Sequence, residues 1–171
     1  IGLYVLLNAL LHREQRKYRD LLTSIFMMVI AIVWFLYVTD FLATQGDGVM
    51  TYRYQNFMYD GSGSLVTVIK SVILCPMKAI YECVDKEKLS FIALTLLPLL
   101  GLPLLTRRFE RFILLIPYVL INLMSDYQYQ HDIFFQYTFG SVVCMFYLTV
   151  LNLADLKVEW IKIPVVFAAL L

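Results

Sequence analysis

Long apolar runs separated by short polar or charged segments make up most of this chain. A helix needs about 20 residues to cross a bilayer, and four runs reach or approach that length: 21–43, 89–106, 112–125 and 140–154. Shorter apolar runs stand at the two ends, 1–11 and 163–171. The pattern predicts an all-α polytopic membrane protein with about four full transmembrane helices and two partial ones. Because both end runs are cut short, we expect an internal fragment of a longer chain.

The stretch 65–84 has a different period. Its apolar residues recur about every 3.6 positions, as on one face of a helix, and Lys70, Lys78 and Glu82 occupy the opposite stripe. Charged side chains spread through the run disfavour a spanning helix. The pattern therefore predicts an amphipathic helix in the membrane interface, kinked at Pro76. A helix packed on a soluble subdomain is the alternative.

The charged loops alternate in sign. Segment 12–20 carries four basic and two acidic residues, and turn 107–111 carries three and one. Region 44–88 is balanced, with five of each, and loop 126–139 has two acidic residues and no Lys or Arg. The positive-inside rule places the two positive segments in the cytoplasm. We therefore expect one multi-pass region of the plasma membrane over residues 1–171, with 44–88 as an extracytoplasmic loop.

Composition narrows the class of protein. Hydrophobic residues make up 61% of the chain and the mean hydropathy is +0.74, whereas soluble domains are about 45–50% apolar. The lipid bilayer is the expected partner. A formal net charge of +1 argues against nucleic acid. The three cysteines form no CxxC pair, so they predict neither a disulfide framework nor a zinc site. Oligomeric state and enzymatic activity stay undecided by these features.

The most unusual stretch is 95–126, where prolines and arginines interrupt apolar sequence. The prolines are Pro98, Pro103 and Pro117, and the arginines are Arg107, Arg108 and Arg111. Each buried Arg would cost about 2.5–3.5 kcal/mol on insertion scales, so we expect the arginines at the exposed tip of a helical hairpin. The prolines free carbonyls that another helix, a hydroxyl or water must satisfy. They either shape helix packing or line a wet cavity.

Several short motifs are found in a characteristic order. They are "YRYQNF" with the amphipathic helix after it, "PLLGLPLL" (98–105), "LLIPYVLINLMS" (114–125) and "QY" (136–137). In this order they resemble a family of bacterial predicted multi-pass membrane proteins, domain of unknown function 2079, over about residues 18–155. That family is distantly similar to the GT-C membrane glycosyltransferases, which take a sugar from a polyprenyl-phosphate carrier. The resemblance carries over no catalytic residue, because the GT-C acidic loop lies earlier than this sequence begins.

The outer segments supply candidate substrate-binding residues. An arginine between tyrosines can hold a phosphate bidentately while sugar or isoprenoid packs on the rings. The candidates are Arg53, Tyr52, Tyr54, His131 and Tyr137. A surface arginine within an interfacial aromatic belt is the alternative.

A second group sits in loop 126–139. Asp126, His131 and Asp132 could bind a divalent cation or a cation-bridged lipid phosphate, although such residues are also common in solvated loops. If the charge alternation holds, Arg53 and this group lie on the same side of the membrane and can meet there.

The resemblance implies a GT-C-like glycosyltransferase with a polyprenyl-phosphate sugar donor, and this is the function we expect. A transporter or flippase-like protein is the first alternative, because proline-broken helices near mid-membrane are expected there too. The scarcity of charge inside the predicted spans weighs against it. A non-catalytic membrane scaffold is the other alternative.

Overall fold

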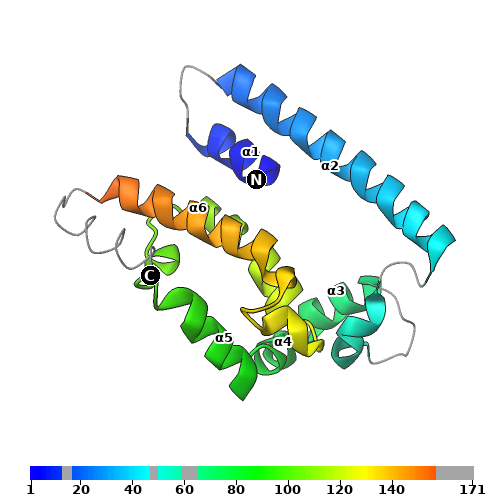
Figure 1. The fold of residues 1–171 in the computed structure, drawn as a ribbon. Helices are drawn as coiled ribbons and strands as arrows, with labels where there is room; N and C mark the ends of the chain where they lie inside the picture. Colours follow the sequence, from blue (N-terminus) through cyan, green and yellow to red (C-terminus); the bar gives the residue numbers. More distant parts are fainter. Residues whose placement is uncertain (13–16, 47–49, 59–64, 157–171) are drawn as a thin grey trace. The chain divides into compact units, whose positions relative to one another are not determined.

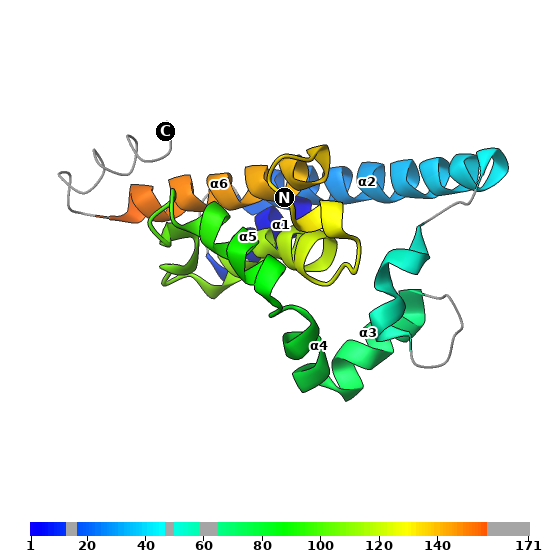
Figure 2. The same ribbon diagram turned by 60° about the horizontal axis from the view of Figure 1, so that its bottom comes forward.

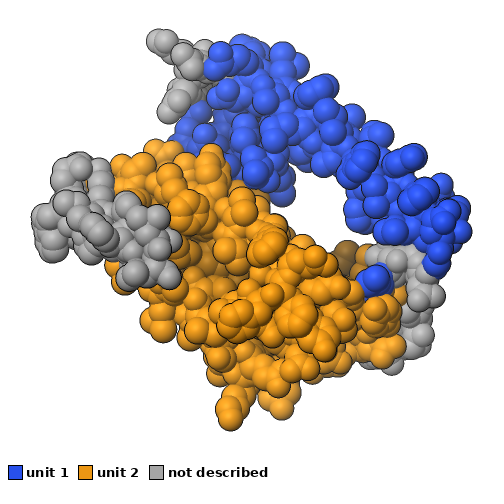
Figure 3. Space-filling view, viewed as in Figure 1, with its two compact units in different colours: residues 1–50 blue, residues 51–171 orange. Residues whose placement is uncertain are grey.

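The structure is a computed structural model that describes residues 1–12, 17–46, 50–58 and 65–156. The described residues form helices and connecting turns with no strand, which confirms the all-α prediction. The chain divides into two compact units, residues 1–50 and residues 51–171, coloured blue and orange in Figure 3.

Unit 1 is a helical pair. Helix α1 (Gly2–Leu11) packs on the much longer α2 (Lys17–Gln45), and Tyr4 and Ala9 are buried between them. Gly2 allows the close approach, because a Cβ there would lie 3.1 Å from the Cγ of Met28. Along the rest of α2 most large apolar side chains are exposed. That exposure suits a helix surrounded by lipid.

The described residues of unit 2 form four α-helices with shorter 3₁₀ and π segments (Figure 1). In chain order they are η1 (Thr51–Phe57), α3 (Leu65–Leu74), α4 (Pro76–Glu82), α5 (Lys86–Leu96), η2 (Leu102–Leu104), η3 (Phe109–Leu115), the π-helix η4 (Tyr118–Leu123), η5 (Gln128–His131), η6 (Gln136–Thr138) and α6 (Phe139–Asp155). Helix α6 lies along the irregular segment η2–η4 (Figures 1 and 2).

Apolar clusters pack the described residues of unit 2, and two of them join separate elements. The larger joins α5, η4 and α6 through Phe91, Tyr118 and Met145, and the Phe91 and Tyr118 rings stack with their centroids 5.4 Å apart. The smaller joins η1 to α3 through Phe57 and Val68. Both reach the segment that ends at Met124, so this segment connects the two halves of the unit.

Two helices are long and apolar enough to cross a membrane in the described part of the chain, not about four as predicted. They are Tyr18–Gln45 and Gln136–Asp155, with mean hydropathies of 2.5 and 1.5 over their most apolar stretches. Gly2–Leu11 is a shorter apolar helix, and the predicted partial span 163–171 lies outside the described residues.

The prolines explain why the two middle spans are missing. Helix α5 ends at Leu96, directly before the turn that contains Pro98, and the backbone then reverses through left-handed φ angles at Leu100 (51°) and Gly101 (68°). Pro117 is followed by one turn of π-helix instead of a continuing α-helix. Proline lacks the N–H that an α-helix needs, so neither run continues as the long α-helix that was predicted over 89–106 and 112–125.

The predicted amphipathic stretch 65–84 forms two helices, because Pro76 begins a new helix, α4, after a break at Cys75. The buried face of α3 includes Thr67 and Ser71, which are polar, whereas Ile69 and Ile73 are exposed. An outward apolar face is what an interfacial helix presents to lipid. The interfacial location stays a prediction.

Candidate functional site

Arg53 and three tyrosines form the centre of the candidate site. The side chain of Arg53 projects from η1, is only 8% exposed, and holds its guanidinium carbon 4.4 Å from the ring centroid of Tyr127. The corresponding distances are 5.0 Å for Tyr137 and 5.9 Å for Tyr52. A guanidinium within about 6 Å of an aromatic face is attracted by the ring quadrupole. The structure thus brings together three predicted substrate-binding residues: Arg53, Tyr52 and Tyr137.

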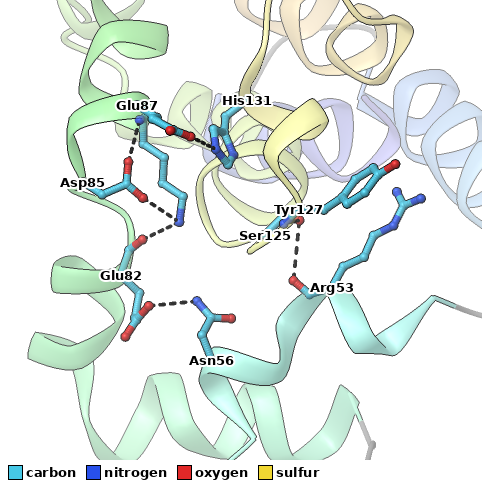
Figure 4. A network of polar contacts seen from close by, with 9 residues as sticks. Arg53, Asn56, Glu82, Asp85, Glu87, Ser125, Tyr127 and His131 are labelled. Atoms are coloured by element: carbon cyan, nitrogen blue, oxygen red, sulfur yellow. Dashed lines mark hydrogen bonds and ion pairs between the residues drawn. The ribbon is translucent and has the colours of Figure 1, made fainter.

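The backbone holds this arrangement in place. The Asp126 N–H donates to the Arg53 carbonyl at 2.8 Å, and the Ser125 hydroxyl lies 3.5 Å from the same oxygen (Figure 4). The Ser125 oxygen also accepts from the Tyr127 N–H at 3.1 Å. Main-chain contacts therefore fix the position of Tyr127 relative to η1, independently of the side-chain attraction.

A buried polar network joins loop 126–139 to η4 and α6. Asn122, which is fully buried in η4, donates to the Gln130 carbonyl and accepts from the hydroxyl of Ser141 on α6. Buried amides are costly unless hydrogen-bonded, so this network specifies one arrangement of η4, η5 and α6. An isolated Asn within an apolar run was the only signal of it in the sequence.

Aromatic side chains from the same loop line a pocket of about 530 Å³, here called the aromatic pocket. Its lining residues are Tyr127, Tyr129, Phe134, Phe135, Gln136, Tyr137 and Phe139. The Tyr127 ring meets Tyr129 and Tyr137 edge to face, with centroid distances of 5.3 Å and 5.9 Å. Tyr127 and Tyr137 also contact Arg53, so the same two residues line the aromatic pocket and pack against the guanidinium.

A second pocket, here called the polar pocket, has a volume of about 470 Å³ and lies between the start of α5 and the same loop. Its lining residues are Lys86, Glu87, Ser90, Phe91, Leu94, Gln128, His131, Asp132, Ile133 and Phe134. The Nε2 of His131 lies 3.6 Å from the Glu87 carboxylate, whereas its Nδ1 is enclosed without a hydrogen-bond partner among the described residues (Figure 4). Phe134 lines both pockets.

Tyr54, another candidate substrate-binding residue, forms a hydrogen bond to the π-helix. The Tyr54 hydroxyl donates to the Leu120 carbonyl at 3.1 Å, so Tyr54 ties η1 to the π-helix. Burial raises the pKa of Tyr54 above its usual value, and the positive charge of Arg53 acts against that increase.

The candidate metal ligands do not converge in the structure. Asp126 is exposed, and Asp132 accepts a hydrogen bond from the Phe134 N–H at 3.0 Å. Within the described ranges no three or more His, Cys, Asp or Glu side chains gather as a metal-binding group. His131 faces Glu87 instead.

Comparison with known protein families identifies the family of this chain. A family model described as "Predicted membrane protein (DUF2079)" matches residues 1–171. The chain belongs to this family. The comparison finds no match among curated proteins or solved structures. As a DUF2079 membrane protein the chain sits in a lipid bilayer, which accounts for the exposed apolar faces of α2 and α6.

The junction of α4 and α5 in this DUF2079 chain was not predicted. Asp85 caps α5 by accepting from the Lys88 N–H at 2.7 Å, and the buried Lys88 ammonium donates to the Glu82 carbonyl at 2.6 Å. Asn56 donates to the Glu82 carboxylate at 3.0 Å, which links this junction to η1 (Figure 4). The sequence signal was Asp85 directly before the helix, with Glu87 in its first turn.

Proposed function

We propose that this DUF2079 protein binds a polyprenyl-phosphate sugar donor and acts as a GT-C-like glycosyltransferase. The observation that carries the proposal is the Arg53 guanidinium held against Tyr127 and Tyr137, two residues that also line the aromatic pocket. Such a donor has a phosphate, a sugar and an apolar chain. The site offers a matching cation, aromatic faces and a membrane setting.

The phosphate would bind at Arg53. The Arg53 side chain is buried, and its Nε finds no hydrogen-bond partner among the described residues. A planar guanidinium can donate two parallel hydrogen bonds to a phosphate, and it does so while its face stays on an aromatic ring. Binding an anion would therefore satisfy the Arg53 charge without disturbing its contacts with the tyrosines.

The aromatic pocket would receive the group next to the phosphate. Sugar rings and isoprenoid chains both present C–H surface, which packs on aromatic faces, and the tyrosine hydroxyls can bond to sugar oxygens. A volume of about 530 Å³ lies within the usual range for small-molecule sites, roughly 300–1,000 Å³. His131 in the polar pocket, beyond Phe134, would contact a hydroxyl-bearing part of donor or acceptor.

Direct binding tests this proposal. Purified full-length protein in detergent is titrated with a short-chain polyprenyl phosphate, using wild type, Arg53→Ala and Arg53→Lys. Loss of a hydrogen-bonded ion pair costs about 1.5–3 kcal/mol, so Arg53→Ala should weaken binding roughly tenfold to a hundredfold. Arg53→Lys should retain part of the affinity, because the charge stays but the bidentate geometry is lost.

The matched control is Lys70→Ala, which removes one positive charge from an exposed position on α3. It should leave binding unchanged. Equal affinity of wild type and Arg53→Ala would refute the phosphate site.

One observation favours a transporter or flippase-like protein as the second candidate. Between α5 and α6 the chain runs through 3₁₀ and π segments, and irregular backbone at membrane depth is found where it is buried in protein or lines a cavity. Proteoliposomes separate the two functions. A transferase releases polyprenyl phosphate and glycosylates an acceptor, whereas a flippase moves the intact lipid between leaflets with no covalent change.

A further inference from the structure

Arg111 is buried, unlike the exposed hairpin tip that the sequence predicted. The residue is only 4% exposed and lies against the C-terminal end of α6. One terminal nitrogen donates to the Leu151 carbonyl at 3.0 Å and to Asn152 Oδ1 at 2.9 Å, and the other lies 2.8 Å from Asp155 Oδ2. Its Nε has no hydrogen-bond partner among the described residues.

A pocket of about 320 Å³ opens beside this guanidinium. Its lining residues are Leu105, Thr106, Arg107, Arg111, Asn152, Asp155 and Leu156. We call it the arginine pocket. It combines the buried, hydrogen-bonded guanidinium of Arg111, the exposed side chain of Arg107, and the hydroxyl-bearing side chain of Thr106.

Among the described residues, positive charge is in excess around the arginine pocket. Asp155 is shared between Arg111 and Arg108, whose Nε lies 3.7 Å from the same carboxylate oxygen. Arg107 adds a third positive charge to the lining. Glu110 is buried outside the lining and takes part in an interaction of its own. Even with Glu110 counted, three arginines face two carboxylates, so an added anion would complete the charge balance.

The surroundings of the arginine pocket are apolar. Leu105, which lines it, is 69% exposed, and the neighbouring Phe109 is 79% exposed. In a protein that sits in a bilayer, such side chains contact acyl chains. A basic pocket with an apolar rim fits an anionic lipid better than a small soluble anion.

We propose that the arginine pocket binds the phosphate of an anionic glycerophospholipid, with Arg107 and Arg111 as the cationic contacts and Leu105 and Phe109 against its acyl chains. This site is separate from the one around Arg53. Arg111 positions the phosphate while it remains bound to α6. Arg107 adds the contact that is made only when lipid is present.

Native mass spectrometry of the full-length protein, titrated with phosphatidylglycerol and separately with phosphatidylcholine, tests the proposal. Wild type should bind phosphatidylglycerol in preference. Arg107→Ala should weaken phosphatidylglycerol binding about tenfold or more, the scale for one hydrogen-bonded ion pair. Because Arg107 is exposed, this variant should fold normally. Lys78→Ala, which removes an exposed charge from α4, is the matched control and should have no effect.

Competition with inorganic phosphate distinguishes the two sources of the anion. Millimolar phosphate should leave phosphatidylglycerol bound, because the acyl contacts are made only by the lipid. Displacement by millimolar phosphate would show an anion site without lipid selectivity and would overturn the proposal. Equal binding by wild type and Arg107→Ala would overturn it as well. Arg53→Ala should not change phosphatidylglycerol binding, so failure here and failure of the proposed function are separable.

Discussion

The guanidinium of Arg53 lies on the ring of Tyr127, with 4.4 Å between the guanidinium carbon and the ring centroid, and the Asp126 N–H donates to the Arg53 carbonyl. Arg53 comes from η1, directly before the amphipathic stretch, and Tyr127 comes from the loop between the π-helix and α6. The contact therefore connects the two halves of unit 2. It also places a buried cation beside an aromatic pocket.

A double-mutant cycle should measure this contact. Tyr127→Leu removes the aromatic face, and Tyr127→Phe keeps it. A partly desolvated cation–π pair contributes about 0.5–2 kcal/mol, so Tyr127→Leu should lower the unfolding free energy by at least that amount more than Tyr127→Phe. In an Arg53→Met background the difference should shrink by about 0.5–2 kcal/mol, to the part that comes from the edge-to-face contacts of Tyr127 with Tyr129 and Tyr137. Equal stabilities of the two Tyr127 variants with Arg53 present would show that the backbone contacts alone hold the loop.

Asp85 should stabilise α5 in a pH-dependent way. Burial acts to raise the pKa of its carboxyl, but the hydrogen bond from the Lys88 N–H and the Lys88 charge outweigh burial and lower it below the usual 3.8. A lowered folded pKa means that the ionised form contributes stability. The contribution is fully present above about pH 4–5 and is lost as the pH falls through 3.8 to the lower folded value.

Thermal unfolding of wild type and Asp85→Asn checks this dependence. Asparagine keeps a capping oxygen but cannot ionise, so the gap between the two midpoints should be constant near neutral pH and close below pH 3.8. Asp85→Ala should lose about 1 kcal/mol more at neutral pH, because it also lacks the cap. A gap that stays constant down to pH 3 would contradict the ion-pair account.

Leu100 should be replaceable by glycine with a gain in stability. It has a φ of 51°, a left-handed conformation that costs a non-glycine residue about 1–2 kcal/mol, and its side chain is exposed. Leu100→Gly should raise the unfolding midpoint. Gly101→Ala should lower it through the backbone alone, because a Cβ there has no atom within 4 Å. A lower midpoint for Leu100→Gly would indicate that Leu100 packs on something the turn needs.

Cysteine labelling should decide the topology. In a background without the native cysteines, cysteines at Gly48 and Gly61, which lie outside the described residues, should react with an impermeant reagent from outside the cell. By the positive-inside rule a cysteine at Phe109 should not react, which requires the chain to cross through α5 and the turn after it, although α5 alone has only 11 residues. External labelling at Phe109 as well as at Gly48 and Gly61 would place all three positions on one side of the membrane and contradict the cytoplasmic location of the arginines, leaving α2 and α6 as the candidate spans of the described chain.

The sequence predicted α2 and α6 well, because each is a long apolar run without an internal proline. It predicted α5 and the segment after it poorly. Leu-rich and Ile-rich sequence suits α, 3₁₀ and π backbones alike, so Pro98 and the reversal at Leu100 determine where the helix ends. The hydrophobicity pattern of the run does not show where the helix ends.

The sequence supported the candidate site only in part. It singled out Arg53 and Tyr137 from their chemistry, and the structure places both beside Tyr127. The burial of Arg111 could not be predicted, because its partners Asn152 and Asp155 are on α6, far along the chain. Long-range pairing of this kind depends on tertiary packing, which no local period encodes.

Photo-crosslinking with a polyprenyl phosphate that carries a diazirine near the phosphate tests the central claim most directly. Protein in membranes is irradiated with this probe and digested, and the labelled peptides are identified by mass spectrometry. The account predicts labelling of the peptides that contain Tyr52 and residues 127–139, with loss of both signals when unlabelled polyprenyl phosphate is added or Arg53 is replaced by alanine. Labelling confined to α2 or α6, unchanged in Arg53→Ala, would contradict it.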